Sequence, residues 1–414
     1  MSGVALGVNG QIEQLAHINS DPAAGGITRE VFTADYMTAN DYVADLMREI
    51  GLSVRLDPFG NLFGRLEGSD PTAPAVMTGS HIDTTLNAGA YDGVLGVLGA
   101  IEAVRQLSSG AEGRPRRSIE VVVFAGEEPR FGSGCIGSRA LVGQLSREDL
   151  DAMRDRSGVS IAEALRGVGL DPDRVGEASL DPSGVMAFVE LHIEQGSVLE
   201  ELGVPIGVVT HIAAPHDMLV TIRGAAAHAG ATPMHARRDA LAGAVEAAVE
   251  LERLGRESPS GTTVATVGAI SASPGAINVI PGEAELKVDI RDRDLAARDA
   301  VADAFLAALA EITERRGLEL EVATIARDTP VQCSPVIVDA ARAACRELAV
   351  EHVEITSGAY HDAMLMSAKV PVGMIFVPSV GGISHSPHEY TKPDDIDRGV
   401  HVLAGTLRVL AETP

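Results

Sequence analysis

The sequence predicts a two-domain α/β protein. One domain has a mixed, mainly parallel sheet with helices on both faces, and a smaller α+β domain is inserted into it. The 414 residues exceed what one ordinary hydrophobic core holds, and 45% of them are hydrophobic, as in globular proteins. Short apolar runs alternate with helical patterns in the outer parts of the chain, whereas the middle shows the one-sided alternation of a half-buried sheet.

Continuous apolar runs predict the strands of the first domain. We expect strands at 75–78, 119–125, 185–191 and 372–377, and helices at stretches such as 94–107 and 336–348. Near-continuous apolar strands separated by helices are typical of a parallel sheet covered on both faces. The segments "GSHID", "FAGEE" and "ELHIEQG" fall where such strands end. Open α/β sheets bind their ligands at these carboxyl ends.

The middle of the chain predicts a βαββαβ unit, which is the split-βαβ or ferredoxin-like arrangement. In one strand, Ala284, Leu286, Val288 and Ile290 alternate with polar residues, so one face is buried. The other expected elements are strands at 218–223, 262–270, 283–291 and 318–325, a helix at 235–254, and a helical stripe through Val301, Phe305, Leu309 and Ile312.

These elements define the predicted domains. We expect one domain from residues 1–211 and 329–414 and a second domain at 212–328, whose helices cover one face of its sheet. Exposed loops are expected at 108–117 and 257–261.

Composition excludes several classes of protein. The net charge of -25 makes nucleic acid an unsuitable partner, because phosphate binding requires clustered Lys and Arg. Cys135, Cys333 and Cys345 lack CxxC spacing, so neither a disulfide framework nor a thiolate zinc site is expected. The N-terminal stretch lacks a signal-peptide pattern, and no run of about 18 apolar residues predicts a membrane span. We therefore expect a cytoplasmic protein.

Histidine and acidic residues at strand ends predict a metal site. His81 follows a strand, and Asp83 stands two residues later, where a carboxylate can orient a ligand imidazole. Such a short motif is weak evidence alone. Asp92 stands at the expected start of a helix, where its carboxylate either caps the helix or binds a metal.

Further candidate ligands strengthen this interpretation. Glu127 and Glu128 are adjacent acids after an apolar strand, and such like charges are costly unless a cation neutralises them. His192 ends another strand, and "GGISHSPHEYT" supplies His385 and His388. Any one of these residues is better explained as an ordinary hydrogen-bonded residue. The whole set favours a two-metal site with one free carboxylate that accepts a proton.

Together the motifs resemble the M20-type metallohydrolases, and within them the hydantoinase/carbamoylase branch. That branch contains N-carbamoyl-L-amino acid hydrolases, β-ureidopropionases, allantoate amidohydrolases and ureidoglycolate amidohydrolases. The matching stretches span most of the chain, in the order "FGNLFGRLEG", "GSHIDT", "YDGVLGVLGAIEA", "GEEPRFGSGCIGSRAL", "ELHIEQGSVLE", "GAAAHAGATPM", "GAINVIPGEAELKVDIRD", "SGAYHDA" and "MIFVPSVGGISHSPHEYT".

The resemblance implies a role for each candidate at the metals. Glu127 would be the general base and later the general acid, and Asp83 would hold the His81 ring. The cofactors would be two divalent ions, Zn²⁺ or Mn²⁺, with Co²⁺ or Ni²⁺ also compatible with these donors. The implied ligands are His81, Asp92 and His192 for one ion, and Asp92, Glu128 and His385 for the other.

The resemblance also implies contacts to the substrate. His228 would donate a hydrogen bond to the developing oxyanion. The planar guanidinium of Arg291 suits a substrate carboxylate, although a salt bridge with a neighbouring acid such as Asp289 is its ordinary explanation. The other implied contacts are Gln195, Asn278, Tyr360 and His361.

The implied activity is that of a metal-dependent amidohydrolase. It would cleave the ureido C–N bond of an N-carbamoyl amino acid or a ureido acid such as ureidoglycolate or allantoate, and release ammonia and CO₂. The inserted domain would act as a lid and form a homodimer. An N-acyl amino acid amidase or dipeptidase of the same superfamily is the alternative, followed by a binding protein without catalysis.

Three positions bear on the choice of substrate. His192 replaces the acid usual in related exopeptidases, which favours the carbamoylase branch. Pro129 and Tyr360 replace glycines of many carbamoylases and are more similar to the ureidoglycolate amidohydrolases.

Overall fold

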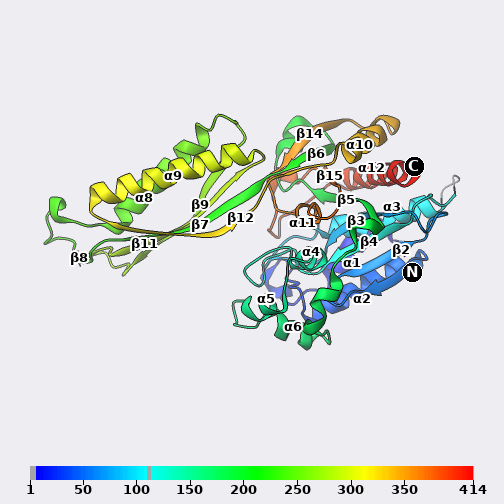
Figure 1. Ribbon diagram of the computed structural model, residues 1–414, viewed down its shortest axis with the longest axis horizontal. Helices are drawn as coiled ribbons and strands as arrows, with labels where there is room; N and C mark the ends of the chain where they lie inside the picture. The colour runs from blue at the N-terminus through cyan, green and yellow to red at the C-terminus, as the bar shows by residue number, and fades with distance from the viewer. Residues whose placement is uncertain (1–5, 110–112, 414) are drawn as a thin grey trace. The chain divides into compact units, whose positions relative to one another are not determined.

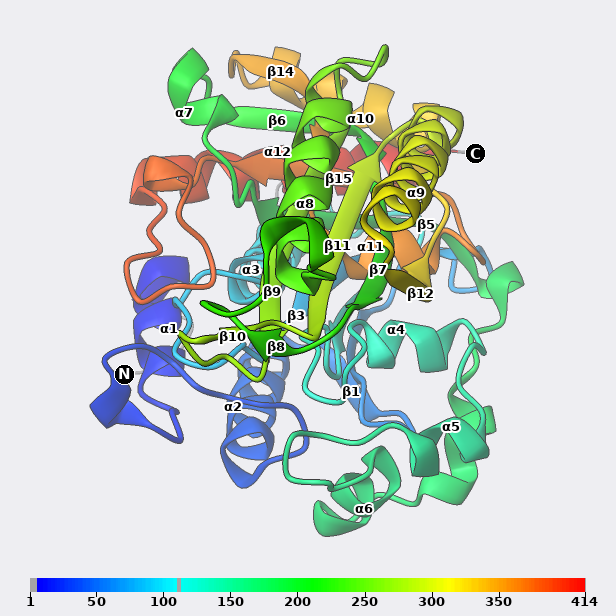
Figure 2. The same cartoon turned by 90° about the vertical axis from the view of Figure 1, so that its left-hand side faces the viewer.

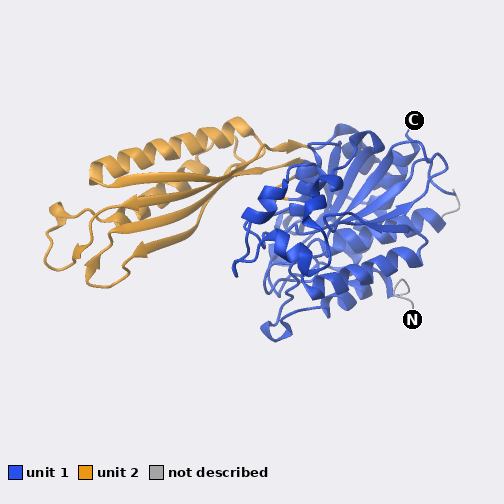
Figure 3. Ribbon diagram, turned by 60° about the horizontal axis from the view of Figure 1, so that its bottom comes forward, with its two compact units in different colours: residues 1–210, 333–355, 361–414 blue, residues 211–332, 356–360 orange. Residues whose placement is uncertain are grey.

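The computed structural model describes residues 6–109 and 113–413, and its chain divides into two compact units (Figure 3). Unit 1 comprises residues 1–210, 333–355 and 361–414, and unit 2 comprises residues 211–332 and 356–360. Residue 211 and the segments 329–332 and 356–360, which we predicted in the first domain, belong to unit 2. Within that unit, Ala213 N–H donates to Ser357 O at 2.8 Å. Residues 110–112 of the expected loop lie outside the described residues.

Unit 1 is built on the expected mixed, mainly parallel sheet (Figure 1). Its four central strands run parallel in the order β4 (Ile119–Phe124), β3 (Ala75–His81), β5 (Val185–Ile193) and β15 (Val372–Val377). Antiparallel strands extend the sheet, namely β2 (Leu62–Leu66) on β4, β1 (Ser53–Leu56) on β2, and β6 (Ile206–Ile212) on β15. Two further strands pair with β6, namely β14 (His352–Ser357) and β13 (Val331–Gln332), the latter formed by residues of unit 2. Every residue of β3, β4 and β15 is buried, as their continuous apolar sequences predict.

Helices of unit 1 pack closely on this sheet. The central strands contact α3 (Val94–Ser109), α10 (Pro335–Glu347), α11 (Asp362–Met366) and α12 (Pro393–Glu412), while α2 (Ala34–Glu49) contacts β1 and β2. Gly96 brings α3 so near β5 that an added Cβ would stand 2.3 Å from Leu191 O. The remaining helices are α1 (Gly7–Ala16), α4 (Ile136–Leu141), α5 (Arg147–Ala152), α6 (Ile161–Gly167) and α7 (Val198–Leu202). No described helix combines the length and apolar character needed to cross a membrane.

Unit 2 follows the order βαββαβ. Its main elements are β7 (Ala214–Arg223), α8 (Ala240–Arg256), β9 (Val264–Ser273), β11 (Glu283–Asp292), α9 (Leu295–Arg316) and β12 (Glu319–Arg327). The four strands form an antiparallel sheet in the order β12-β7-β11-β9, and both helices cover one face of it (Figures 1 and 2). The alternating residues of β11 are buried against these helices, namely Ala284, Leu286, Val288 and Ile290.

Two local features of unit 2 differ from the prediction. The first helix begins at Ala240 instead of His235, because Arg237 is extended and Asp239 caps the helix by accepting from Ala242 N–H at 3.0 Å. A short antiparallel pair, β8 (Ala227–His228) with β10 (Val279–Ile280), was not predicted. Two paired residues are too few to produce a periodic pattern in the sequence.

Phe305→Ala tests the core of unit 2. Phe305 is 0% exposed within a cluster formed by the sheet and both helices. Truncation of a buried Phe costs about 3–5 kcal/mol. We expect the free energy of unfolding of unit 2 to fall by this amount, as measured by circular dichroism during urea denaturation. Ile325→Ala, at a residue 59% exposed on β12, is the control. A loss for Phe305→Ala no larger than that of the control would contradict the packing described.

Candidate metal centre

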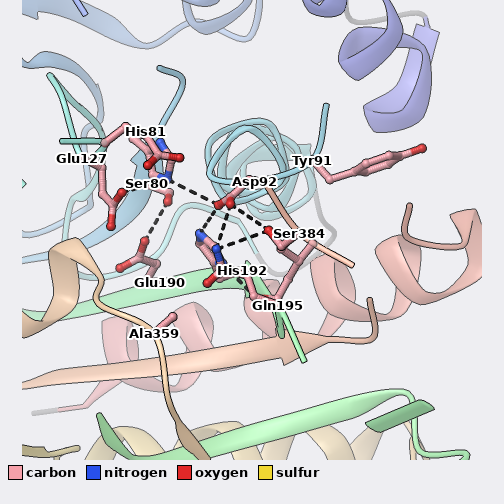
Figure 4. Close-up of polar contacts among 12 residues, drawn as sticks. Ser80, His81, Tyr91, Asp92, Glu127, Glu190, His192, Gln195, Ala359 and Ser384 are labelled. Atoms are coloured by element: carbon pink, nitrogen blue, oxygen red, sulfur yellow. Dashed lines mark hydrogen bonds and ion pairs between the residues drawn. The ribbon is translucent and has the colours of Figure 1, made fainter. Parts of the chain in front are cut away.

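The predicted ligands converge near the carboxyl ends of the parallel strands, and Figure 4 shows His81, Asp92 and His192 among them. His81 is the last residue of β3, and His192 stands one residue before the end of β5. Glu127 and Glu128 follow β4, which lies next to β3. Asp92 comes from the loop that leads into α3. Neighbouring parallel strands therefore bring together side chains that are far apart in the sequence.

Asp92 lies at the middle of this group. Its Oδ1 is 3.2 Å from His192 Nε2 and 3.7 Å from His81 Nε2. Its Oδ2 is 3.1 Å from His385 Nε2, which in turn lies 3.5 Å from Glu128 Oε1. The two carboxylate oxygens thus face two different sets of ligand atoms.

These two sets have the composition and spacing of metal sites. Ligand atoms lie within 4.8 Å of one another in each set, one made by His81, Asp92 and His192 and the other by Asp92, Glu128 and His385. Imidazole nitrogens and carboxylate oxygens suit Zn²⁺, Mn²⁺ and similar divalent ions. The candidate His388 is exposed and belongs to neither set.

A third set of possible ligands shares His192 with the first set. Glu190, His192 and His361 also have ligand atoms within 4.8 Å of one another. However, both oxygens of Glu190 already accept hydrogen bonds, Oε1 from Ser80 Oγ at 2.7 Å and Oε2 from Ala363 N–H at 3.0 Å. The His361 ring packs edge-on against His192, with 4.6 Å between centroids. His361 is thus buried beside a ligand.

Backbone carbonyls orient the two buried imidazoles. His81 Nδ1 lies 3.0 Å from Asp83 O, and His192 Nδ1 lies 2.9 Å from Ile193 O. With Nδ1 facing a carbonyl, each Nε2 is directed at Asp92 and would bind an ion once it has lost its proton.

The Asp83 carboxylate holds the segment that carries the adjacent acids. It accepts Glu127 N–H at 3.2 Å and Glu128 N–H at 3.0 Å. Its Oδ1 is also 3.6 Å from His81 Nδ1, farther than the carbonyl of the same residue. Asp83 therefore links the end of β3 to the loop after β4.

Glu127 stands beside His81 without belonging to either set. Its Oε2 lies 3.8 Å from His81 Nε2, and its Oε1 accepts a hydrogen bond from the Cys135 thiol at 3.6 Å. Burial raises the pKa of Glu127 well above its ordinary value, and the charge of Glu128 raises it further against the opposing effect of His81. A carboxyl group of raised pKa can accept and return a proton near neutral pH.

The centre contains closely packed, buried acids. Burial and then the charge of Asp92 raise the pKa of Glu128 to about 7. The hydrogen bond to Asp92 raises the pKa of His385 to about 9. Buried like charges are costly, and a shared divalent cation removes that cost. The donor set therefore fits metal ions.

Gln195 and Ser384 contact the oxygen of Asp92 that faces His385 (Figure 4). Gln195 Nε2 donates to Asp92 Oδ2 at 2.8 Å, and Ser384 Oγ lies 3.1 Å from the same atom. Gln195 Oε1 is buried and has no hydrogen-bond partner among the described residues. Gln195 and His385 have φ values of 59° and 52°, a conformation that costs about 1–3 kcal/mol in residues other than glycine.

Two predicted substrate contacts lie exposed in unit 2. His228 Nδ1 accepts N–H groups from Gly230 at 3.1 Å and Ala231 at 3.2 Å. An imidazole that accepts at Nδ1 carries its proton on Nε2, so His228 presents an N–H donor. Asn278 is held through its carbonyl, which accepts Ala229 N–H at 2.9 Å.

Arg291 forms a salt bridge with the neighbouring acid Asp289, which was the alternative to its predicted contact with a substrate carboxylate. Its Nε lies 2.9 Å from both oxygens of Asp289, and its Nη1 donates to Gly358 O at 3.0 Å. Tyr360 also belongs to unit 2, where its hydroxyl donates to Asp328 Oδ2 at 3.1 Å.

Sequence reasoning missed several polar residues behind the ligands. Glu190 stands within the buried strand β5, and a lone acid among apolar residues was a usable signal. Cys135, Ser384 and Glu389 stand in stretches that carried the family resemblance, but no spacing rule distinguishes them from their neighbours. Their contacts depend on loops brought together by the fold.

Comparisons with known proteins agree with this geometry. Residues 78–409 match the model of the peptidase family M20/M25/M40. The chain is 44% identical to an N-carbamoyl-L-amino acid amidohydrolase of Geobacillus stearothermophilus, with 97% of each chain covered. It is 42% identical to a ureidoglycolate hydrolase of Arabidopsis thaliana, with 98% of this chain and 87% of the relative covered.

A solved structure extends the similarity to the fold. The crystal structure of AtUAH in complex with glyoxylate has a TM-score of 0.86 at 41% identity, and the match covers 98% of this chain and 97% of that chain. The chain therefore belongs to the peptidase family M20/M25/M40. The family predicted from the motifs is confirmed, and with it the class of metal-dependent amidohydrolases.

Gly93→Ala tests the approach of the backbone to His81. Gly93 has φ of 64°, and an added Cβ would stand 2.3 Å from His81 Nε2. We expect the variant to fold but to retain less Zn²⁺ than the parent after dialysis, measured by plasma mass spectrometry. Gly203→Ala is the control, because Gly203 has φ of 69° and nothing within 4 Å of an added Cβ. Equal metal content in all three proteins would contradict the ligand role of His81.

Proposed function

We propose that the protein hydrolyses the ureido C–N bond of a small ureido acid or N-carbamoyl amino acid. The observation that carries this proposal is the Asp92 carboxylate shared between two sets of metal ligands, with the free carboxylate of Glu127 beside them. The ureido substrates named for the relatives from Geobacillus stearothermophilus and Arabidopsis thaliana support it.

Two divalent ions, Zn²⁺ or Mn²⁺, would complete the centre, with Co²⁺ or Ni²⁺ also compatible with the donors. When bound, they supply Lewis-acid catalysis and lower the pKa of water. The residues that would hold them are His81, Asp92 and His192 for one ion, and Asp92, Glu128 and His385 for the other.

Two residues of the chain handle the proton and the developing charge. Glu127 accepts the proton of the attacking water, for which its raised pKa is suited. The Nε2–H of His228 donates to the carbonyl oxygen as it becomes negative. Glu127 then returns the proton to the leaving nitrogen. The products are the free amine and a carbamic acid that breaks down to CO₂ and ammonia.

Other residues select the substrate. The unpartnered Oε1 of Gln195 accepts an N–H of the ureido group, since a buried acceptor without a partner is costly. Arg291 binds the substrate carboxylate by exchanging part of its pairing with Asp289. The remaining contacts are assigned to Asn278, Tyr360 and His361.

A homodimer through unit 2 is part of the proposal. Strand β9 is an edge strand, and α8 exposes Val245 by 50% and Val249 by 64%. An unpaired sheet edge and an apolar helix surface are typical of contacts between subunits.

Glu127→Gln separates metal binding from proton transfer. The amide keeps the shape of the side chain but cannot accept a proton, so we expect kcat to fall at least about 100-fold while the metal content stays parental. The measurement is ammonia release together with mass spectrometric metal analysis. A variant that keeps its metals and turns over substrate at the parental rate would exclude Glu127 as the base.

A matched substrate panel tests the activity itself. The Zn²⁺- or Mn²⁺-loaded protein should release ammonia from at least one of ureidoglycolate, allantoate, N-carbamoyl-β-alanine and N-carbamoyl-L-amino acids. The N-acetyl counterparts, assayed for free amine, should remain intact. Cleavage of an acetyl compound with no reaction of any ureido compound would favour an N-acyl amino acid amidase or a dipeptidase. No reaction in either series would favour a binding protein.

A further inference from the structure

Glu389 is a buried acid that the proposed reaction does not use. Its side chain is 5% exposed. Its Oε1 accepts the backbone N–H groups of Tyr91 at 2.9 Å and Asp92 at 3.1 Å, and its Oε2 lies 2.9 Å from Ser384 Oγ. This one carboxylate therefore connects the loop that carries Asp92 with the loop that carries His385.

Ser384 stands between two carboxylates. Its Oγ lies 2.9 Å from Glu389 Oε2 and 3.1 Å from Asp92 Oδ2. A hydroxyl has one proton, so it donates to only one of them at a time. Asp92 Oδ2 also accepts a hydrogen bond from Gln195 Nε2. Donation of the Ser384 proton to Glu389 therefore leaves one electron pair of Asp92 Oδ2 available to a cation, whereas donation to Asp92 competes with that cation.

The protein leaves space for the Glu389 carboxylate. A Cβ added at Gly89 would stand 2.3 Å from Glu389 Cβ and 2.4 Å from its Oε1. A buried carboxylate costs several kcal/mol unless hydrogen bonds compensate, and here two backbone N–H groups and one hydroxyl do so. Glycine at position 89 permits this arrangement, which an alanine would displace.

We propose that Glu389 is a positioning residue for the metal centre. It fixes the backbone of Asp92 and draws the Ser384 proton away from Asp92 Oδ2, so that this oxygen is available to the ion shared with Glu128 and His385. The inference rests on the proposed function in one respect, namely that these three ligands bind an ion. A purely structural Glu389 would affect stability and leave metal affinity unchanged.

The test compares the affinities of the two metal equivalents in four variants. Glu389→Ala removes the carboxylate that accepts these hydrogen bonds, and Gly89→Ala displaces that carboxylate without altering any of the predicted metal ligands. Glu389→Gln keeps an acceptor for the backbone N–H groups but offers N–H to Ser384, which directs the hydroxyl proton to Asp92. Asp57→Ala is the matched control, because Asp57 is 7% exposed and its Oδ1 also accepts backbone N–H groups, from Phe59, Gly60 and Asn61.

Zn²⁺ titration against a chromophoric chelator measures both affinities, and the visible spectrum of the Co²⁺ protein reports the ligand geometry. We expect Glu389→Ala and Gly89→Ala to weaken one equivalent about 10–100-fold and to change the Co²⁺ spectrum, as is usual when a residue behind a ligand is lost. Glu389→Gln should weaken the same equivalent by less. Asp57→Ala should lower the melting temperature and leave both affinities and the spectrum parental.

Parental affinities and spectra in both Glu389→Gln and Gly89→Ala would overturn the inference, and these two variants decide the question if Glu389→Ala does not fold. An equal loss in the Asp57→Ala control would also overturn it, because the effect would then follow from general destabilisation. If the parent protein binds no second equivalent of Zn²⁺, the proposed two-metal centre is wrong. This failure is distinguishable from failure of the inference, because it is measured in the parent protein before any variant is compared.

Discussion

The burial of the Asp92 carboxylate between three imidazoles is the constraint on which the site depends. Burial opposes its ionisation, yet the neighbouring imidazoles of His192, His385 and His81 hold the pKa of Asp92 well below its usual value. Each imidazole comes from a different part of the chain. The arrangement therefore exists only where β3, β5 and the loop after β15 meet at one edge of the sheet.

Small residues make that meeting possible. Gly93 lets the backbone pass within contact of His81, Gly96 seats α3 on Leu191, and Gly89 leaves room for Glu389. The abundance of glycine, 44 residues, and the 3% of aromatic residues are consistent with such close packing of backbone on backbone. Charged ligands can be buried near each other because the surrounding chain approaches them closely enough to supply N–H donors.

The two units contain different parts of the chemistry. All predicted metal ligands and Glu127 lie in unit 1, whereas His228, Asn278, Arg291 and Tyr360 lie in unit 2. The polar groups of unit 2 are oriented locally: the loop after β8 sets the tautomer of His228, and Asp289 holds Arg291. Each unit thus prepares its side chains by hydrogen bonds of its own, which is how preorganised groups avoid later reorganisation.

The sequence by itself determined the family, the mixed parallel sheet and the candidate ligands, because apolar runs and motifs such as "GSHID" are local properties. The alternation in β11 likewise identified a buried sheet face. Only the tertiary structure decided that Asp92 faces two ligand sets, that Arg291 is paired with Asp289, and that Glu389 holds the Asp92 backbone. Those contacts join residues from separate loops, and no periodicity or spacing along the chain encodes which loops the fold brings together.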